Sequence, residues 1–150
     1  MKITGSLPLN TEVGNAWEDL YPPGEPTNWI VGDWQKFIPN DSLRFMKRDQ
    51  GTPASGASLA KHVSVKWFVH EPAHPAQWGQ AKPPGAGRTL SILANGGKFQ
   101  VTFWGADPEQ KCIVTLDTPG DFAIWGDGVS HSWRPIETSS IITIRWEPLT

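Results

Sequence analysis

The chain has 150 residues, which is enough for one domain with a real core and too few for two ordinary domains. Its formal net charge is -2 at pH 7 and no long run of one sign occurs, so a nucleic-acid protein with a basic stripe is not expected. No apolar stretch approaches the length of a membrane span, and the N-terminus lacks the apolar core of a secretion signal. We therefore expect a cytoplasmic protein without nucleic-acid or membrane partners.

Residues 1–61 are rich in turn-forming stretches such as "YPPGEPTNW" and "DQGTPASGAS". Between these stretches lie two strand candidates, residues 28–38 and 42–48. The pattern predicts an N-terminal arm, residues 1–61, with short strands that pack on a barrel formed by residues 62–150. Because the arm carries several tryptophans, it is a natural cover for exposed sheet edges, and a two-fold homodimer is the expected assembly.

From His62 onward the sequence reads as one short strand after another, separated by some of the chain's fifteen glycines and fourteen prolines. We expect a hairpin-type turn at "NGG", residues 95–97, and no segment has a helical period over ten residues. Such spacing is typical of an all-β sandwich, barrel or jelly roll. The expected strands are 62–70, 88–94, 98–104, 112–116, 121–125, 130–135 and 140–146.

The stretch "TPGDFAIWGDGVSHSW", residues 118–133, resembles the second sequence motif of the cupin superfamily. Gly120, Gly128 and His131 stand at the motif's spacing, whereas Gly126 replaces its usual proline and Pro135 its usual asparagine. The strand rhythm that follows residue 62 also resembles small single-domain bacterial cupins. The resemblance implies a double-stranded β-helix, or jelly-roll barrel, in which the motif histidine faces a cavity.

The first cupin motif, which normally supplies His-x-His and a glutamate as metal ligands, is degenerate here. The expected glutamate falls at or near Thr89, and the expected histidines fall in "KPPGAG", which contains none. An alternative metal site would combine His131 with His70 and His74, and with Glu71 these would offer the imidazole and carboxylate set that suits Zn, Fe, Mn or Ni. Because the family ligands are missing, we favour a site without a tightly bound metal.

Strand alternation supplies further cavity candidates, because every second residue faces the same side. Trp133 shares a face with His131, and Arg145 shares one with Ile141 and Thr143. Thr89 and Ser91 lie on the opposite face of their strand from Arg88. If Arg88 or Arg145 faced the cavity, its guanidinium would select a ligand with a carboxylate or phosphate group. The chain's nine tryptophans suggest core fillers or an aromatic-lined cavity, to which Trp67, Trp125 and Trp133 would contribute. The single cysteine, Cys112, is expected to be a small buried filler.

The sequence is compatible with two functions of the expected barrel. The first is binding of a small polar or anionic metabolite in an aromatic-lined cavity, with His131 as a candidate for metal-independent acid/base catalysis. The second is a metal-dependent cupin enzyme of isomerase, epimerase, decarboxylase or dioxygenase type that uses His131 with His70 and His74. The missing first-motif ligands favour the first, and a structural dimer with a filled cavity is a third reading.

Overall fold

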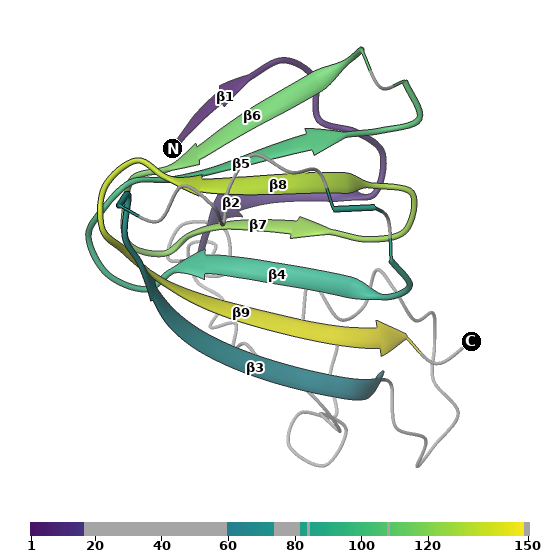
Figure 1. The fold of residues 1–150 in the computed structure, drawn as a ribbon. Coiled ribbons are helices and arrows are strands. Elements are labelled where there is room, and N and C mark those ends of the chain that lie inside the picture. The colour runs from purple at the N-terminus through teal and green to yellow at the C-terminus, as the bar shows by residue number, and fades with distance from the viewer. Residues whose placement is uncertain (17–59, 74–81, 84, 108, 149–150) are drawn as a thin grey trace, which may run out of the picture.

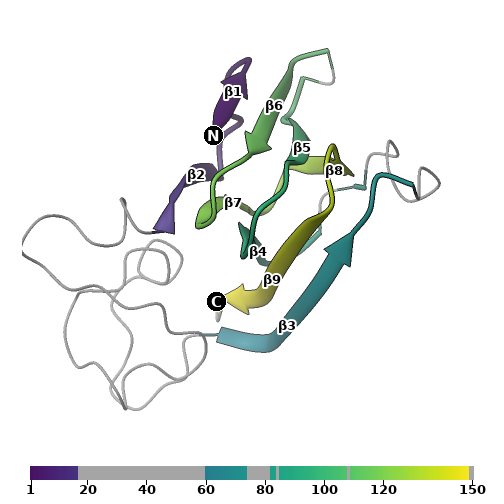
Figure 2. The same cartoon turned by 90° about the vertical axis from the view of Figure 1, so that its left-hand side faces the viewer.

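The computed structural model describes residues 1–16, 60–73, 82–83, 85–107 and 109–148, and this part of the chain folds into two antiparallel β-sheets that face each other (Figures 1 and 2). The all-β, cupin-like jelly roll expected from the sequence is confirmed. No helix among the described residues is both long enough and apolar enough to cross a membrane. The strands are β1 (Lys2–Thr4), β2 (Thr11–Asn15), β3 (Ala60–His70), β4 (Arg88–Leu93), β5 (Phe99–Trp104), β6 (Lys111–Leu116), β7 (Asp121–Trp125), β8 (Ser130–Pro135) and β9 (Ser139–Pro148).

The chain passes back and forth between the two sheets. One sheet has the strand order β1-β6-β5-β8 and the other has the order β2-β7-β4-β9-β3. The "NGG" segment therefore does not close a hairpin, because β4 pairs with β7 and β9 while β5 pairs with β6 and β8. The turn instead carries the chain from one sheet to the facing one, and this corrects the expected hairpin.

Residues 1–16 belong to both sheets. β1 pairs with β6 at the edge of one sheet, and β2 pairs with β7 at the edge of the other. The sequence patterns did not indicate these two short strands. The strand candidates at 28–38 and 42–48 lie outside the described residues, and the boundary at residue 61 stays a prediction.

The core lies between the sheets and follows the alternation of β5, in which every second residue is buried. Phe99, Val101 and Phe103 are at most 3% exposed, as the sequence pattern predicts. Cys112 on the neighbouring strand is fully buried, which confirms its role as a filler, and burial raises the pKa of its thiol. All five residues of β7 are buried, and the strand lies between β2 and β4 in its sheet.

The motif that contains His131 forms β7, a tight turn and the start of β8. Gly120 and Gly128 both have positive φ angles, 90° and 78°, which explains the need for glycine at these two motif positions. Gly126 meets a different requirement, since a Cβ atom built there would lie 3.0 Å from Cδ of Arg88. The turn thus places His131 at the beginning of a strand whose alternate side chains face the opposite sheet.

Candidate functional site

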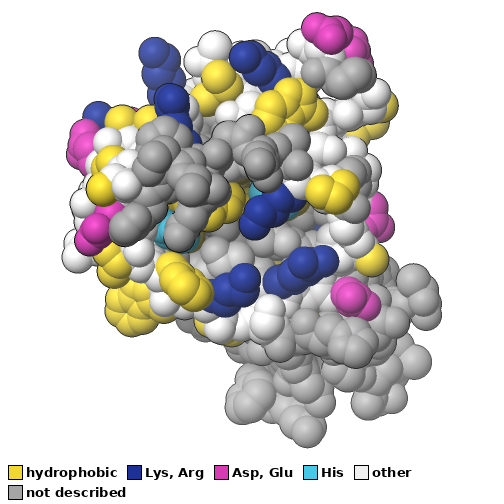
Figure 3. Space-filling model, viewed as in Figure 1, with side chains coloured by type: hydrophobic (Ala, Val, Ile, Leu, Met, Phe, Trp, Pro, Cys, Tyr) yellow, Lys and Arg dark blue, Asp and Glu magenta, His cyan; other side chains and the backbone are white. Residues whose placement is uncertain are grey.

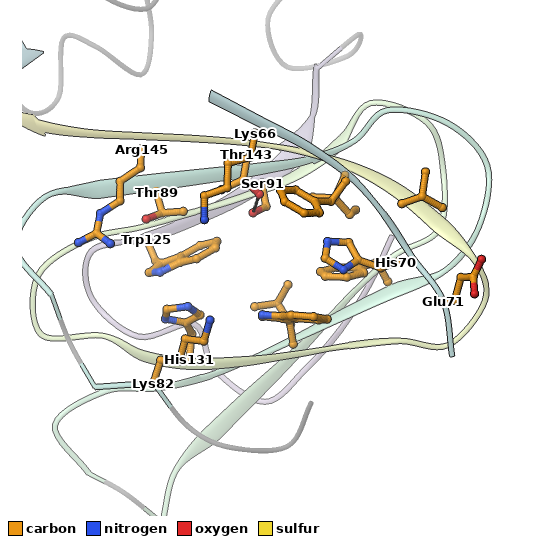
Figure 4. A pocket seen from close by; sticks show the side chains of 16 residues that line it. Lys66, His70, Glu71, Lys82, Thr89, Ser91, Trp125, His131, Thr143 and Arg145 are labelled. Carbon is orange, nitrogen blue, oxygen red and sulfur yellow. Dashed lines mark hydrogen bonds between the residues drawn. The ribbon is translucent and has the colours of Figure 1, made fainter. Parts of the chain in front are cut away.

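A cavity of about 470 Å³ lies between the two sheets, and its volume is within the range of small-molecule sites. Side chains from β3, β4, β5, β7, β8 and β9 form its walls, together with residues of the segment before β4 (Figure 4). The described lining residues are Lys66, Phe68, Val69, His70, Glu71, Lys82, Thr89, Ser91, Phe99, Val101, Trp125, His131, Trp133, Ile141, Thr143 and Arg145.

The polar wall of the cavity comes from the alternation of β4 and β9. Thr89 pairs with Arg145 and Ser91 pairs with Thr143, and all four line the cavity. The hydroxyls of Ser91 and Thr143 are 3.1 Å apart and form a hydrogen bond. The two sets of residues that the sequence placed on common faces therefore meet on the cavity side of one sheet.

His131 occupies one end of the cavity, where its ring packs against Trp125 with 4.7 Å between ring centroids. Burial, followed by the positive charges of Lys82 and Arg145, lowers the pKa of His131 to about 4. Its Nδ1 atom is buried without a hydrogen-bond partner among the described residues, so a second ring proton would gain no bond there. At neutral pH the imidazole is therefore uncharged.

Lys82 reaches this end of the cavity through an isolated β-bridge to β8. The backbone N–H of Lys82 donates to the carbonyl of His131 over 2.7 Å, and the N–H of His131 donates back over 3.1 Å. Arg145 also braces the segment before β4, because its Nη2 donates to the carbonyl of Ala86 over 3.2 Å. Two cationic side chains thus flank the neutral imidazole.

Aromatic rings form the opposite end of the cavity. The ring centroid of His70 lies 4.6 Å from that of Trp133 and 5.3 Å from that of Phe99. Phe68 stacks on His70 from the same strand, with 6.0 Å between centroids. Burial lowers the pKa of His70, so this end of the cavity also lacks an imidazolium at neutral pH.

Charge is distributed unevenly over the lining. Lys66, Lys82 and Arg145 are labelled in the half of Figure 4 that contains His131 and Trp125, whereas the carboxylate Glu71 lies at the far end beyond His70. On the face seen in Figure 3, Lys and Arg side chains gather near the visible histidine, and acidic side chains lie mostly toward the periphery. The cavity therefore has a cationic end.

The structure brings together most of the residues singled out from the sequence. The cavity includes His131, His70, Trp125, Trp133, Arg145, Thr89 and Ser91. Trp67 does not line it, because the cavity side of β3 carries Lys66, Phe68 and His70, and Trp67 is 69% exposed on the other face. Arg88 does not line it either, since its side chain packs over Gly126 on the opposite side of β4 from Thr89. His74 lies outside the described residues.

Phe68, Phe99 and Lys82 are lining residues that the sequence reasoning did not select, whereas Lys66 was weighed, like the arginines, as a possible cavity cation. Phe68 and Lys66 share the His70 face of their strand, so alternation carried a signal for both once His70 was considered a cavity residue. Phe99 is the first residue of a strand with a correctly predicted buried face. Lys82 stands in a proline-rich segment without periodicity, and no sequence signal indicates its bridge to His131.

The described lining does not match a three-histidine metal centre. Among the described residues no three His, Cys, Asp or Glu side chains are grouped so that they could hold a metal ion. Lys82 and Arg145 act electrostatically on His131, and positive charge at that position opposes a divalent cation as it opposes a proton.

No protein-family model and no curated protein sequence matches the chain. Solved structures with a similar fold include Streptomyces albus HEPD with 2-hydroxyethylphosphonate and Fe(II) bound, at 15% identity and a TM-score of 0.48, covering 58% of this chain and 18% of that one. The Drosophila melanogaster CENP-C cupin domain gives 18% identity, a TM-score of 0.45 and coverage of 54% and 59%. The Campylobacter jejuni WlaRB TDP-quinovose 3,4-ketoisomerase gives 10% identity and a TM-score of 0.44, and the match covers 58% of this chain and 63% of that one. The chain thus spans less than two thirds of these structures, and the likeness concerns the fold.

Proposed function

We propose that the cavity binds a small anionic metabolite and that Lys66, Lys82 and Arg145 hold its charged group. The observation that carries the proposal is the arrangement of charge, because these three cations belong to one half of the cavity and Glu71 lies at the far end. A guanidinium can bind a carboxylate or phosphate through two parallel hydrogen bonds, and a lysine adds a mobile point charge.

His131 fits this site as a neutral hydrogen-bonding group. Since its pKa is about 4, the imidazole is uncharged at neutral pH, so its protonated ring nitrogen can donate a hydrogen bond to the anionic ligand while its other ring nitrogen can only accept one. A catalytic base works best when its pKa lies near the working pH, and this pKa is well below it. The observation favours binding and orientation of the ligand over metal-independent proton transfer by His131.

The proposal is tested by titrating the chelator-treated protein with inorganic phosphate at low ionic strength in a calorimeter. The Arg145→Gln variant is expected to bind phosphate at least roughly tenfold more weakly, because a charge-assisted hydrogen bond is lost. Lys66→Gln, which leaves the hydrogen bond from Arg145 to Ala86 in place, is expected to weaken binding in the same direction.

Arg134→Gln is the matched control, because Arg134 is exposed on β8, bonds to Gln100 over 2.8 Å and does not line the cavity. It should retain the phosphate affinity of the unaltered protein. Equal affinities for Arg145→Gln, Lys66→Gln and Arg134→Gln, or no phosphate binding by the unaltered protein, would refute the proposed anion site.

We also propose that two copies of the chain associate through β3. This strand is the last of its sheet and pairs with β9 alone among the described strands. Its outer face carries Val65 and Trp67, which are 64% and 69% exposed. Antiparallel pairing of the same edge strand from two copies is compatible with two-fold symmetry, would cover the backbone edge that no described strand pairs with, and would bring the exposed side chains of the two copies side by side.

Light scattering coupled to size-exclusion chromatography tests this assembly. The unaltered protein is expected to elute as a dimer, and Trp67→Glu as a monomer, because the substitution would place like charges opposite each other beside the two-fold axis. Leu9→Glu is the control, since Leu9 is 91% exposed far along the chain from β3 and should leave the dimer intact. A monomeric native protein, or a dimeric Trp67→Glu variant, argues against pairing through β3.

A further inference from the structure

The polarity of the cavity changes in one direction along its strands. In the five-stranded sheet the paired residues Thr89 and Arg145 form one row across the cavity wall, and Ser91, Thr143 and Lys66 form the next. The row after that pairs Ile141 with Phe68 and carries no polar side chain into the cavity. The wall therefore passes from cationic, through hydroxyl-bearing, to apolar within three cross-strand rows.

The facing sheet changes in the same direction. His131, paired with Phe103 on β5, packs on Trp125 at the cationic end. Two residues along β8, Trp133 stacks on Phe99 with 5.7 Å between centroids and contacts His70 at the other end. Figure 4 shows the same division, with Arg145 and Lys82 at one end and His70 at the other. Both walls thus place positive charge at one end, and aromatic contact at the other end, where Glu71 is the charged lining residue.

We infer that the ligand is an amphipathic anion, in which one carboxylate or phosphate head is joined to a flat or linear apolar body. This inference rests on the proposed function, because it takes the anion site at Arg145 as the position of the head. The body would lie between Phe68 and Ile141 on one side and Trp133 and Phe99 on the other.

The length of the ligand follows from the strand geometry. Arg145 and Ile141 are four residues apart on β9, which corresponds to about 13 Å along an extended strand. The reach of the arginine side chain and the width of the rings shorten the span that a ligand must bridge. A head with an aryl ring on a short linker, or with a chain of about six to eight carbons, matches it.

The two simpler ligand classes each leave half of the cavity unsatisfied. An inorganic anion would use Arg145 and Lys82 and leave the rings of Trp133 and Phe99 in contact with water. A neutral apolar molecule would bury the cations without a counter-charge, which costs more than it gains. An amphipathic anion satisfies both ends, and each buried methylene would raise its affinity roughly three- to fourfold.

The test compares ligands that differ only in the body or only in the head, by calorimetry on the full chain. Acetate, butyrate, hexanoate and 3-phenylpropionate vary the body, and 3-phenylpropanol removes the charge from the last of these. Phenyl phosphate against inorganic phosphate repeats the comparison for the other head group. We expect 3-phenylpropionate or phenyl phosphate to bind at least roughly tenfold more tightly than acetate or phosphate respectively, and the neutral alcohol to lose that gain.

A variant on β3 distinguishes the contribution of the apolar end of the cavity to ligand affinity from that of the cationic end. Phe68→Ser should lower the affinity for the aryl anion by roughly tenfold and leave that for acetate and phosphate unchanged, because Phe68 faces the apolar end. Leu9→Ser is the control, since Leu9 is 91% exposed, lies outside both the cavity lining and β3, and should change neither. Both side chains are more than half exposed, so these variants are expected to fold.

The outcomes distinguish the inference from the proposed function. If small anions bind and the apolar body adds no affinity, the inference is wrong and the anion site stands. If the aryl anion and its neutral alcohol bind equally well, or if no anion binds, both are wrong. Tighter binding of either the carboxylate or the phosphate ester supports the inference and assigns the head group.

Discussion

The Gly97→Ala variant is expected to lose roughly 3–5 kcal/mol of unfolding free energy, a large effect for the addition of one methyl group. Gly97 has a φ of 121°, a backbone conformation that disfavours any side chain. A Cβ atom at this position would also meet the carbonyl oxygen of Thr138 far inside van der Waals contact and would lie 2.6 Å from Oγ of Ser139. Thr138 immediately precedes β9 and Ser139 is its first residue, so the start of β9 is packed against this crossing between the sheets.

The neighbouring glycine provides a control within the same turn. Gly96 has no atom within 4 Å of a Cβ built on it and does not have a positive φ, so Gly96→Ala should change the unfolding free energy by less than about 1 kcal/mol. Urea denaturation of both variants measures the difference, which corresponds to about 10 °C in melting temperature. Equal stabilities for the two variants would mean that the crossing can rearrange around Gly97, and that the close approach of β9 is not fixed.

Alternation predicted which residues share a face but not which face is inward. In β9 and β4 the sets containing Arg145 and Ser91 were correct, because a period of two fixes relative orientation wherever a strand is regular. In β3 the apolar residues Val65 and Trp67 face outward, while Lys66, Phe68 and His70 face the cavity. Hydrophobicity selects the inner face of a strand only when that face contacts a dry core, and this strand instead borders a partly cationic cavity.

The residues that sequence reasoning missed depend on contacts between distant segments. β1 has three residues, too few to show a period, and its strand conformation depends on pairing with β6 more than one hundred residues later. Lys82 lies outside the named strands and contacts the site through its bridge to His131. In both cases the position depends on a segment distant in the sequence, β6 for β1 and His131 for Lys82, so the local sequence alone does not predict it. The His131 motif was readable because its two turn glycines and its strand alternation are local.

His131 is expected to make the protein less stable as the pH falls from 6.5 to 4. Its pKa is 6.5 in the absence of folded surroundings and about 4 in the folded cavity, so within this window the unfolded chain binds a proton that the folded chain does not. The contribution of the neutral imidazole to the free energy of unfolding is therefore fully present above pH 6.5 and is lost as the pH falls toward 4. Allowing for the partial exposure of the ring, the loss is roughly 2–3 kcal/mol.

Urea denaturation at a series of pH values measures this loss, and His131→Gln should flatten the profile within the window because glutamine does not titrate. His70→Gln is the comparison, since burial lowers the pKa of His70 in the same direction while no cationic neighbour contributes to its shift. Asp121 affects stability only at lower pH. Burial raises the pKa of Asp121, but hydrogen bonds from Asn15 and from the N–H groups of Asp117 and Thr118 outweigh it and lower the pKa overall. The stability that the ionised carboxylate contributes is therefore lost only as the pH falls below the ordinary pKa of 3.8. If the unfolding free energy of His131→Gln fell with pH between 6.5 and 4 as steeply as that of the unaltered protein, another group would be taking up the proton.

Phosphate binding is expected to depend on the same proton. A bound anion favours the imidazolium form of His131, so the affinity for phosphate should rise as the pH falls from 6.5 to 4.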